Sequence, residues 1–263
     1  MAKALPRVLV TRALSQSSEL AETLRTLGAE PVLIPAIETV EPVSFTVLDE
    51  ALAQLGSFHW LLFTSANAVE AFASRLRATV QQQRVVSSFR IAAIGPATAR
   101  ALASAGLRTD LMPEQAVAES LTAALLPFAK RTDGSPTRFL LVRAEEAREH
   151  LPETLRTAGA EVIVAPAYRT VVPEASIALI RTLFADPAET PAAITFTSSS
   201  TARNLLALCD AAGVQFPASA LCVSIGPITS QTLHELGWPP VAEAPEATVK
   251  ALARTVMDTI RNA

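Results

Sequence analysis

LRTLGAEPVLIPAIETVEP at residues 24–42 and LRTAGAEVIVAPAYRTVVP at residues 155–173 are two copies of one segment, 155 − 24 = 131 residues apart. The same offset relates Arg12 to Arg143 and the tripeptide IGP at 94–96 to IGP at 225–227. FTS at 63–65 returns at 196–198, with an offset of 133 (196 − 63). One structural module therefore occurs twice in the chain.

Apolar periodicity predicts how this module folds. An apolar run at 8–11 precedes a helical pattern at 15–27, a glycine stop at Gly28 and a second apolar run at 32–34. This strand–helix–strand order is typical of a parallel βαβ unit, and the second copy repeats it at 139–142, 151–158, Gly159 and 162–164. Further strand–helix pairs follow in both copies, at 60–63 with 68–76, 91–94 with 97–105, 193–196 with 202–211 and 221–225 with 229–236.

The pattern predicts α/β layers with about five parallel strands in each of two sheets, because the apolar runs lack the polar alternation of half-exposed strands. The weakest predicted strands are 107–111 and 240–241. Flavodoxin-like sheets fit this order best.

The chain is long enough for two domains, since 263 residues divide into halves of roughly domain size. Each βαβ unit ends in a proline-punctuated stretch, 35–42 or 166–173, which cannot continue a helix and would serve as a connector. Tandem halves and an interleaved arrangement both remain open on periodicity alone.

Composition narrows the class of protein. Half of the residues are hydrophobic, the net charge is −3, and no basic block exceeds Lys130-Arg131, which argues against a nucleic-acid surface. No apolar run approaches a membrane span and the first residues do not resemble a signal peptide, so we expect a cytoplasmic protein with no membrane partner.

Cys209 and Cys222 are predicted to be buried free thiols. The three histidines stand apart from each other and from the cysteines, so no metal site is expected.

Polar residues follow the predicted strands at their carboxyl ends, where open α/β sheets bind ligands. Singly, each of these residues is most simply a helix cap. Together, the six turns predict a cleft lined by neutral N–H and O–H groups for an anionic ligand. The two arginines would add charge-assisted contacts, although each could equally serve in a structural ion pair. The turns are Thr11-Arg12, Thr64-Ser65-Ala66-Asn67, Gly95-Pro96-Ala97-Thr98, Arg143, Thr197-Ser198-Ser199-Ser200 and Gly226-Pro227-Ile228-Thr229.

Common catalytic motifs are missing: the sequence has no phosphate loop, no dinucleotide-binding glycine pattern and no nucleophile elbow. Tyr168 is the only tyrosine, and its counterpart in the first copy is Ile37 (168 − 131). The duplication therefore breaks at this position. Tyr168 is either a functional group or an aromatic packed at a domain joint.

The motifs VLVTR, FTSANAVEAF, IAAIGPATARAL, LVRAEEAREHLPETLRTAGAEV, APAYRTV, ITFTSSSTARNL and SIGPITSQTLHELG, in this order, resemble the uroporphyrinogen-III synthase family. The resemblance covers nearly the whole chain. It implies two interleaved flavodoxin-like domains, one formed by residues 1–36 and 172–263 and the other by residues 37–171, with the proline-rich stretches as a two-strand bridge.

The resemblance also implies a cofactor-free, monomeric lyase that converts hydroxymethylbilane to uroporphyrinogen III, with transient contact to the enzyme that supplies this substrate. Tyr168 matches the family tyrosine proposed to assist departure of the hydroxyl. The implied substrate-binding residues are Thr11, Arg12, Ser65, Ala66, Asn67, Thr98, Arg143, Ser198, Ser199 and Thr229. A non-catalytic two-domain module that binds small anions is the competing interpretation, and a phosphosugar isomerase is disfavoured because no credible base occupies the turns.

Overall fold

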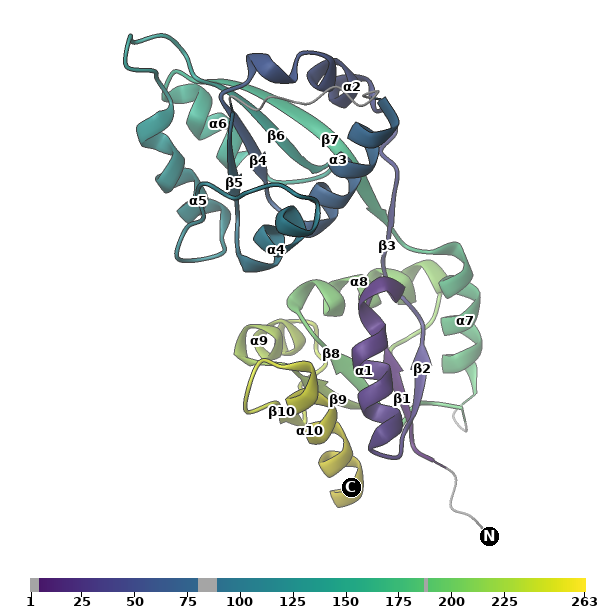
Figure 1. Cartoon of the computed structure of the whole chain (residues 1–263). Helices are drawn as coiled ribbons and strands as arrows, with labels where there is room; N and C mark the ends of the chain where they lie inside the picture. The colour runs from purple at the N-terminus through teal and green to yellow at the C-terminus, as the bar shows by residue number, and fades with distance from the viewer. Residues whose placement is uncertain (1–4, 80–88, 187–188) are drawn as a thin grey trace. The chain divides into compact units, whose positions relative to one another are not determined.

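The computed structural model describes residues 5–79, 89–186 and 189–263, and the chain divides into two compact units (Figure 1). Unit 1 contains residues Met1–Glu38 and Val171–Ala263, and unit 2 contains Thr39–Thr170. The chain therefore leaves unit 1, completes unit 2 and returns, which is an interleaved rather than a tandem arrangement. Each unit is built on a five-stranded sheet.

Unit 1 has the strand order β2-β1-β8-β9-β10, with every pairing parallel. Numbered by appearance in the unit, this order is 2-1-3-4-5, the flavodoxin-like order. Its strands are β1 (Arg7–Val10), β2 (Glu30–Leu33), β8 (Ala193–Phe196), β9 (Leu221–Ser224) and β10 (Ala242–Glu243), and its helices are α1 (Leu14–Thr26), α7 (Glu174–Ala185), α8 (Ser199–Ala212), α9 (Pro227–Glu235) and α10 (Val249–Asn262).

Unit 2 has the strand order β3-β7-β6-β4-β5. The pairings of β6 with β7, β6 with β4 and β4 with β5 are parallel. The strands are β3 (Glu38–Val40), β4 (Trp60–Phe63), β5 (Arg90–Ala93), β6 (Arg138–Ala144) and β7 (Glu161–Val171). The α-helices are α2 (Thr46–Ala53), α3 (Ala66–Thr79), α4 (Pro96–Ser104), α5 (Ala118–Leu125) and α6 (His150–Thr157), with 3₁₀ turns η1 (Leu55–Ser57) and η2 (Leu126–Phe128).

Helices cover both faces of each sheet, so the strands are buried on both sides. In β1, Val8 and Val10 pack with α1 and α10, whereas Leu9 packs with α7, α8 and α9. In β6, Leu140 packs with α2, α3 and α4, while Leu141 packs with α5 and α6. This double burial explains the continuous apolar runs and confirms the predicted α/β, flavodoxin-like class.

The predicted strand at 107–111 is wrong. Only Leu111 in this stretch makes a parallel bridge, to Ala92, whereas the corresponding stretch of unit 1 forms β10 and pairs Ala242 with Val223. Both pairs are related by 131 residues (242 − 111 and 223 − 92). The predicted strand at 240–241 is displaced to Ala242–Glu243. Neither segment has a continuous apolar run, so β10 pairs over two residues and 107–111 makes a single bridge.

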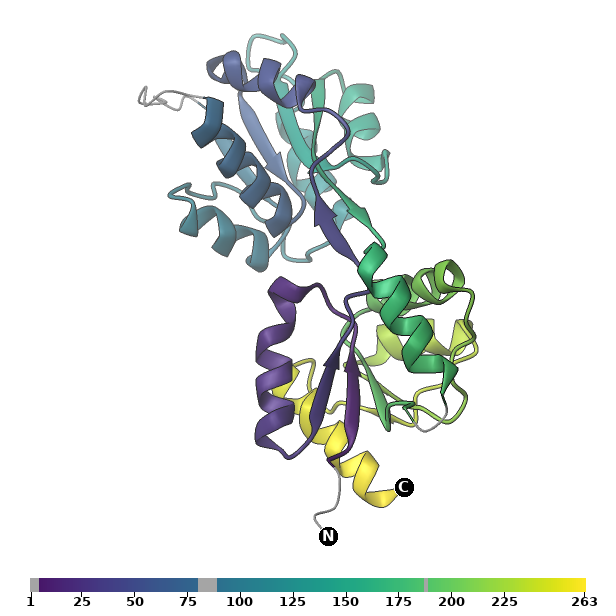
Figure 2. The same ribbon diagram turned by 90° about the vertical axis from the view of Figure 1, so that its right-hand side faces the viewer.

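The fifth strand of the second sheet is instead β3, from the first proline-rich stretch. It lies beside β7, whose eleven residues continue to Val171 at the return to unit 1 (Figures 1 and 2). Residues 35–37 have no regular secondary structure, whereas the matching residues 166–168 lie within β7.

Interleaving predicts which fragments fold. A fragment of residues 39–170 is the whole of unit 2 and omits only the first residue of β3 and the last residue of β7, so we expect one cooperative thermal transition. A fragment of residues 1–131 separates β1 and β2 from β8, and β4 from β6, so we expect no cooperative transition. Circular dichroism melts of both fragments test this, and a cooperative melt of 1–131 together with none for 39–170 would contradict the interleaving.

Candidate functional site

The predicted turns lie at the carboxyl ends of parallel strands in both units. In unit 2 these are the ends of β4, β5 and β6, and in unit 1 the ends of β1, β8 and β9. Parallel pairing brings the carboxyl ends of one sheet to the same edge, so within each unit the turns are neighbours.

Ser65 and Tyr168 meet in unit 2. The Ser65 Oγ lies 3.0 Å from the Tyr168 hydroxyl oxygen, and it also accepts a hydrogen bond from the Ala68 amide at 3.1 Å. The ring of Tyr168 is buried, 9% exposed, and packs in the core cluster that contains Phe63 and Ala68. Tyr168 is thus both a packed aromatic and a partner of a polar turn.

The remaining residues of this turn serve the helix and the neighbouring strand. Ala66 is the first residue of α3 and offers only backbone groups. The Asn67 amide donates from Nδ2 to Thr39 Oγ1 at 3.1 Å, which ties the turn to β3.

Arg143 is almost fully buried, at 5% exposed. Its Nη1 donates to the Arg148 carbonyl oxygen at 2.8 Å, and its Nη2 pairs with the Glu149 carboxylate. Its Nε is buried with no hydrogen-bond partner among the described residues. The guanidinium therefore holds the loop between β6 and α6 in place.

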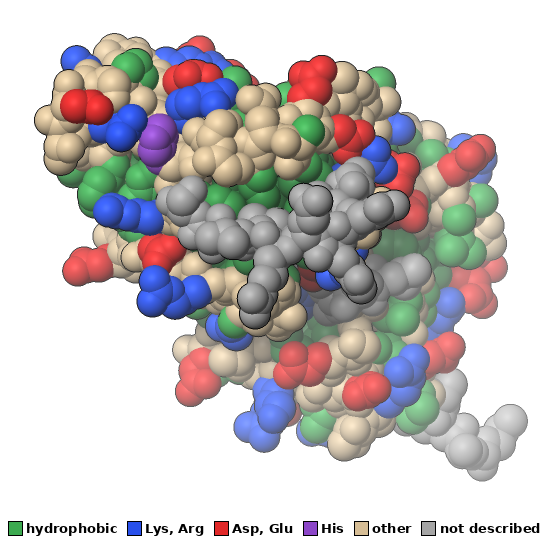
Figure 3. Space-filling model, turned by 45° about the horizontal axis from the view of Figure 1, so that its top comes forward, with side chains coloured by type: hydrophobic (Ala, Val, Ile, Leu, Met, Phe, Trp, Pro, Cys, Tyr) green, Lys and Arg blue, Asp and Glu red, His purple; other side chains and the backbone are tan. Residues whose placement is uncertain are grey.

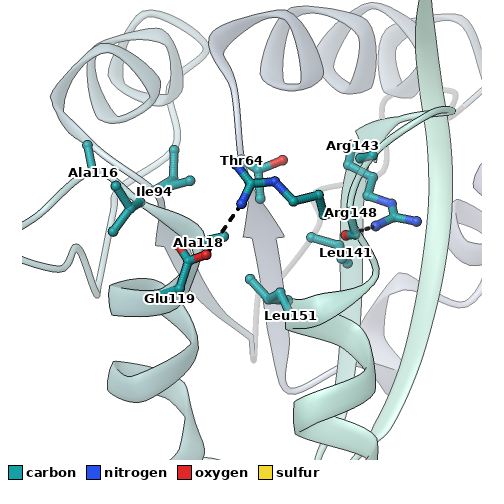
Figure 4. A pocket seen from close by; sticks show the side chains of 11 residues that line it. Thr64, Ile94, Ala116, Ala118, Glu119, Leu141, Arg143, Arg148 and Leu151 are labelled. Carbon is teal, nitrogen blue, oxygen red and sulfur yellow. Dashed lines mark hydrogen bonds and ion pairs between the residues drawn. The ribbon is translucent and has the colours of Figure 1, made fainter. Parts of the chain in front are cut away.

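A pocket of about 300 Å³ opens beside this loop (Figure 4). The side chain of Arg148 extends from the loop across the pocket toward Glu119 at the start of α5, and their charged atoms lie 3.4 Å apart. Both side chains are largely exposed, 85% and 57%, so the pair is weakly held. The residues that line the pocket are Thr64, Ile94, Ala116, Val117, Ala118, Glu119, Leu141, Arg143, Ala147, Arg148 and Leu151.

Gly95 allows the loop before α5 to close over this end of the sheet. A Cβ at Gly95 would lie 2.6 Å from the Ala116 Cβ, closer than packed atoms tolerate. A Cβ at the matching Gly226 of unit 1 would meet nothing within 4 Å. The glycine of the GPAT turn is therefore required by the loop that bounds the pocket.

In unit 1 the serine turn after β8 caps α8 and reaches α9. Ser198 accepts from the Thr201 amide at 3.2 Å. Ser199 Oγ donates to the Ile228 carbonyl at 3.2 Å and accepts from Thr232 Oγ1 at 2.8 Å. This places the serine turn directly beside the GPIT turn.

Thr98 and Thr229 occupy equivalent places in the first turns of α4 and α9 and are buried, at 3% and 5% exposed. Ile228 is by contrast 77% exposed. The GPIT turn therefore exposes the apolar residue Ile228 rather than the threonine.

Thr11 and Arg12 end β1. Thr11 is 1% exposed, and its hydroxyl has no hydrogen-bond partner in the described part of the chain. Partial burial of Arg12 lowers the pKa of its guanidinium, opposed by the nearby carboxylate of Glu19. The guanidinium remains cationic because its ordinary pKa is so high.

Sequence reasoning missed Arg148 and Glu119. Glu119 has no charged neighbour in sequence and Arg148 lies in the charged stretch EEARE at 145–149, and 148 − 119 = 29 residues separate them. Both segments look like solvated helix starts. Only the folded sheet brings α5 and α6 together.

Charged groups are distributed rather than clustered. Figure 3 shows basic and acidic side chains interspersed over the face that it displays. Within residues 5–79, 89–186 and 189–263, no group of three His, Cys, Asp or Glu side chains could hold a metal ion. No described helix is long and apolar enough to span a membrane.

Comparisons with known proteins agree with one another. The family model described as uroporphyrinogen-III synthase HemD matches residues 18–254. A uroporphyrinogen-III synthase from Synechococcus elongatus is 37% identical over 93% of this chain and 92% of its own length. A putative uroporphyrinogen-III synthase from Methanothermobacter thermautotrophicus is 33% identical over 87% of this chain and 88% of its own.

Solved structures share the fold. The mutant uroporphyrinogen III synthase from Thermus thermophilus superposes with a TM-score of 0.66 at 19% identity, over 99% of this chain and 100% of that one. The Helicobacter pylori enzyme gives 0.59 at 18% identity, over 97% of this chain and 100% of its own. At these identities the superpositions establish the fold alone.

Proposed function

Because this chain belongs to the uroporphyrinogen-III synthase family, we propose that it dehydrates and cyclises hydroxymethylbilane to uroporphyrinogen III with inversion of the last pyrrole ring. The observation that carries this proposal is the family match over residues 18–254. A module that only binds small anions is disfavoured, because the match covers both units and the curated relatives are named as synthases.

The chemistry begins at the terminal hydroxymethyl group. The C–O bond breaks with its electron pair going to oxygen, that oxygen takes a proton and leaves as water, and an electron-poor azafulvene remains. We assign the proton to the Tyr168 hydroxyl, because a phenol is protonated at neutral pH and is a hydrogen-bond donor. The substituted α-carbon of the last pyrrole ring attacks the azafulvene carbon and forms a spiro intermediate. The bond from that α-carbon to its original methylene bridge then breaks, which leaves the bridge carbon electron-poor, and the free α-carbon of the same ring bonds to it. Ring closure releases a proton, which restores the phenol.

Holding the substrate matters more than acid strength. The electron-rich pyrrole favours ionisation by itself, so the protein acts chiefly by keeping the ends of the tetrapyrrole where the spiro route outruns direct closure. The substrate carries eight carboxylates, and neutral N–H and O–H donors at helix starts suit them. We assign this role to the turns that contain Thr11, Arg12, Ser65, Ala66, Asn67, Thr98, Arg143, Ser198, Ser199 and Thr229.

The pocket in unit 2 is a candidate binding site for one of these carboxylates. Among the described residues, the Arg148 guanidinium has one ion pair, the exposed pair with Glu119, so a substrate carboxylate can replace Glu119 at little cost in free energy. Arg143 supports this exchange indirectly, since it donates to the Arg148 carbonyl and fixes the loop.

We further propose that the protein acts as a monomer in the cytoplasm and contacts the enzyme that supplies hydroxymethylbilane only transiently. The two thiols fit a reducing compartment, since both are free and buried. Burial raises the pKa of Cys209 to about 11 and that of Cys222 to about 12, so both stay protonated and unreactive.

The purified chain should convert freshly prepared hydroxymethylbilane mainly to the III isomer, with a chelator present and no added cofactor. Chromatographic separation of the oxidised I and III products measures this. A sample without enzyme, which should give the I isomer, is the control. Obtaining only the I isomer with the folded protein would reject the function.

Tyr168→Phe should lower kcat by about 10- to 100-fold while the product remains partly the III isomer, because a lost general acid costs about this much when the substrate ionises readily. The melting temperature of the variant checks that the buried ring still packs. An unchanged kcat would make Tyr168 a packing residue.

Arg148→Ala should raise KM several-fold with little change in kcat, and added salt should reduce the difference between variant and parent. Glu119→Gln should leave KM unchanged or lower it, because the competing carboxylate is removed. The control is Arg131→Ala, which removes another exposed arginine of unit 2, paired at 3.8 Å with Asp133. Equal KM values for all three variants and the parent would exclude this pocket as a carboxylate-binding site.

A further inference from the structure

We propose that Ser65 is a positioning residue for Tyr168: its hydroxyl donates to the phenol oxygen and leaves the phenol hydrogen directed at the departing hydroxyl. This inference rests on the proposed role of Tyr168. It assigns Ser65 a contact with the tyrosine in addition to the substrate contact expected from its turn.

The direction of this hydrogen bond is part of the proposal. A serine hydroxyl has one hydrogen and two lone pairs, and the Ala68 amide uses one lone pair at 3.1 Å. The oxygens of Ser65 and Tyr168 lie 3.0 Å apart, and either hydroxyl can be the donor. We propose donation by Ser65 because it leaves the phenol hydrogen available for the leaving oxygen. The positive end of the α3 dipole polarises this hydroxyl and strengthens it as a donor.

The duplicated unit shows what Ser65 would do without Tyr168. Its counterpart is Ser198 (65 + 133), which accepts from the Thr201 amide and lies 2.9 Å from the Thr201 hydroxyl. Ser198 is therefore satisfied within its own helix. The counterpart of Thr201 is Ala68, which has no hydroxyl, and the counterpart of Tyr168 is Ile37. Differences at two positions thus turn an ordinary helix cap into a partner for the tyrosine.

A register shift in β7 brings the phenol to Ser65. The pairing of β6 with β7 runs from Arg143–Pro166 directly to Ala144–Tyr168, so Ala167 is an extra residue. Ala165, Ala167 and Tyr168 consequently all pack on the face that α3 covers, although regular alternation would send Tyr168 to the opposite face. The bulge is held where the Glu145 amide donates to the Tyr168 carbonyl at 2.8 Å.

This arrangement serves both halves of the proton transfer. Before the transfer, the Ser65 hydrogen occupies the phenol oxygen, so the phenol hydrogen is free for the leaving oxygen. When the C–O bond breaks and the proton moves to form water, the same Ser65 hydrogen bond stabilises the phenolate. The proton released on ring closure returns to it.

A single tyrosine makes the contact directly observable. Protein labelled with ¹³Cζ-tyrosine gives one tyrosine signal, whose chemical shift responds to hydrogen bonding at the phenol oxygen. We expect Ser65→Ala and Ser65→Gly to shift this signal and Ser65→Thr to keep it near the parent position. Glycine is included because it is tolerated at helix N-caps, so at least one variant without the hydroxyl should fold. Ser198→Ala, which removes the equivalent cap in unit 1, should leave the signal in place.

Measurements of kcat distinguish a role of Ser65 in positioning Tyr168 from a role in the stability of the fold. We expect Ser65→Gly to lower kcat by about 3- to 10-fold, Ser65→Thr to restore most of it, and Ser65→Gly with Tyr168→Phe to be no slower than Tyr168→Phe alone. Thr248→Ala removes the cap of α10, whose hydroxyl accepts from Ala251, and should lower the melting temperature without lowering kcat.

An unmoved tyrosine signal, or additive effects of the two substitutions, would overturn the inference while the proposed function stands. A Tyr168→Phe variant as active as the parent would instead remove the role of Tyr168 on which the inference rests. Failure of the parent chain to produce the III isomer would reject the proposed function itself.

Discussion

Parallel strand pairing determines where the polar turns of this protein lie. Because the strands of unit 1, and β4–β7 of unit 2, run in one direction, each unit gathers its strand-to-helix turns at one edge. Helices start there with amide groups that lack partners within the helix. Each unit therefore gathers its helix starts and a serine-containing turn at one edge of its sheet.

The two units share one fold but differ in the side-chain contacts at equivalent positions. Ser198 is satisfied by Thr201, whereas Ser65, facing Ala68, is left to meet Tyr168. Gly95 is needed because Ala116 lies against it, while Gly226 faces open space. Duplication explains the sheets, and these departures from it mark where unit 2 acquired its own pocket and its tyrosine contact.

Much of the fold could be predicted from the sequence, because strands buried on both faces read as plain apolar runs between helical patterns. Gly28 and Gly159, with φ of 88° and 94°, end the two matching helices as the pattern predicts. The edge strands β2 and β5 were predicted, because each has an apolar run. The edge strand β3 was missed and the strand expected at 107–111 does not form, since β3 is three residues long and residues 107–111 contribute only the Leu111 bridge.

The residue types of the candidate site could be predicted from the sequence, but the contacts between them could not. The hydroxyl-containing turns and the single tyrosine are visible in the sequence. The hydrogen bond between Ser65 and Tyr168, however, needs a bulge at Ala167 that the sequence pattern does not predict. Arg143 drew attention as a possible anion contact, and the structure gives it Glu149 and a backbone carbonyl. Arg148 and Glu119 meet only because α5 and α6 pack together on the sheet.

We infer that the tetrapyrrole-binding residues lie at the carboxyl edge of the sheet in each unit. Amide NMR shifts of the ¹⁵N-labelled chain, recorded on adding uroporphyrinogen III under reducing conditions in the dark, test this directly. We expect the largest shifts on the turns at Thr11-Arg12, Ser65–Asn67, Ala97-Thr98, Arg143–Arg148, Ser198-Ser199 and Ile228-Thr229. Shifts concentrated at the opposite edges, around Gly28, Gly159 and Gly237, would contradict it.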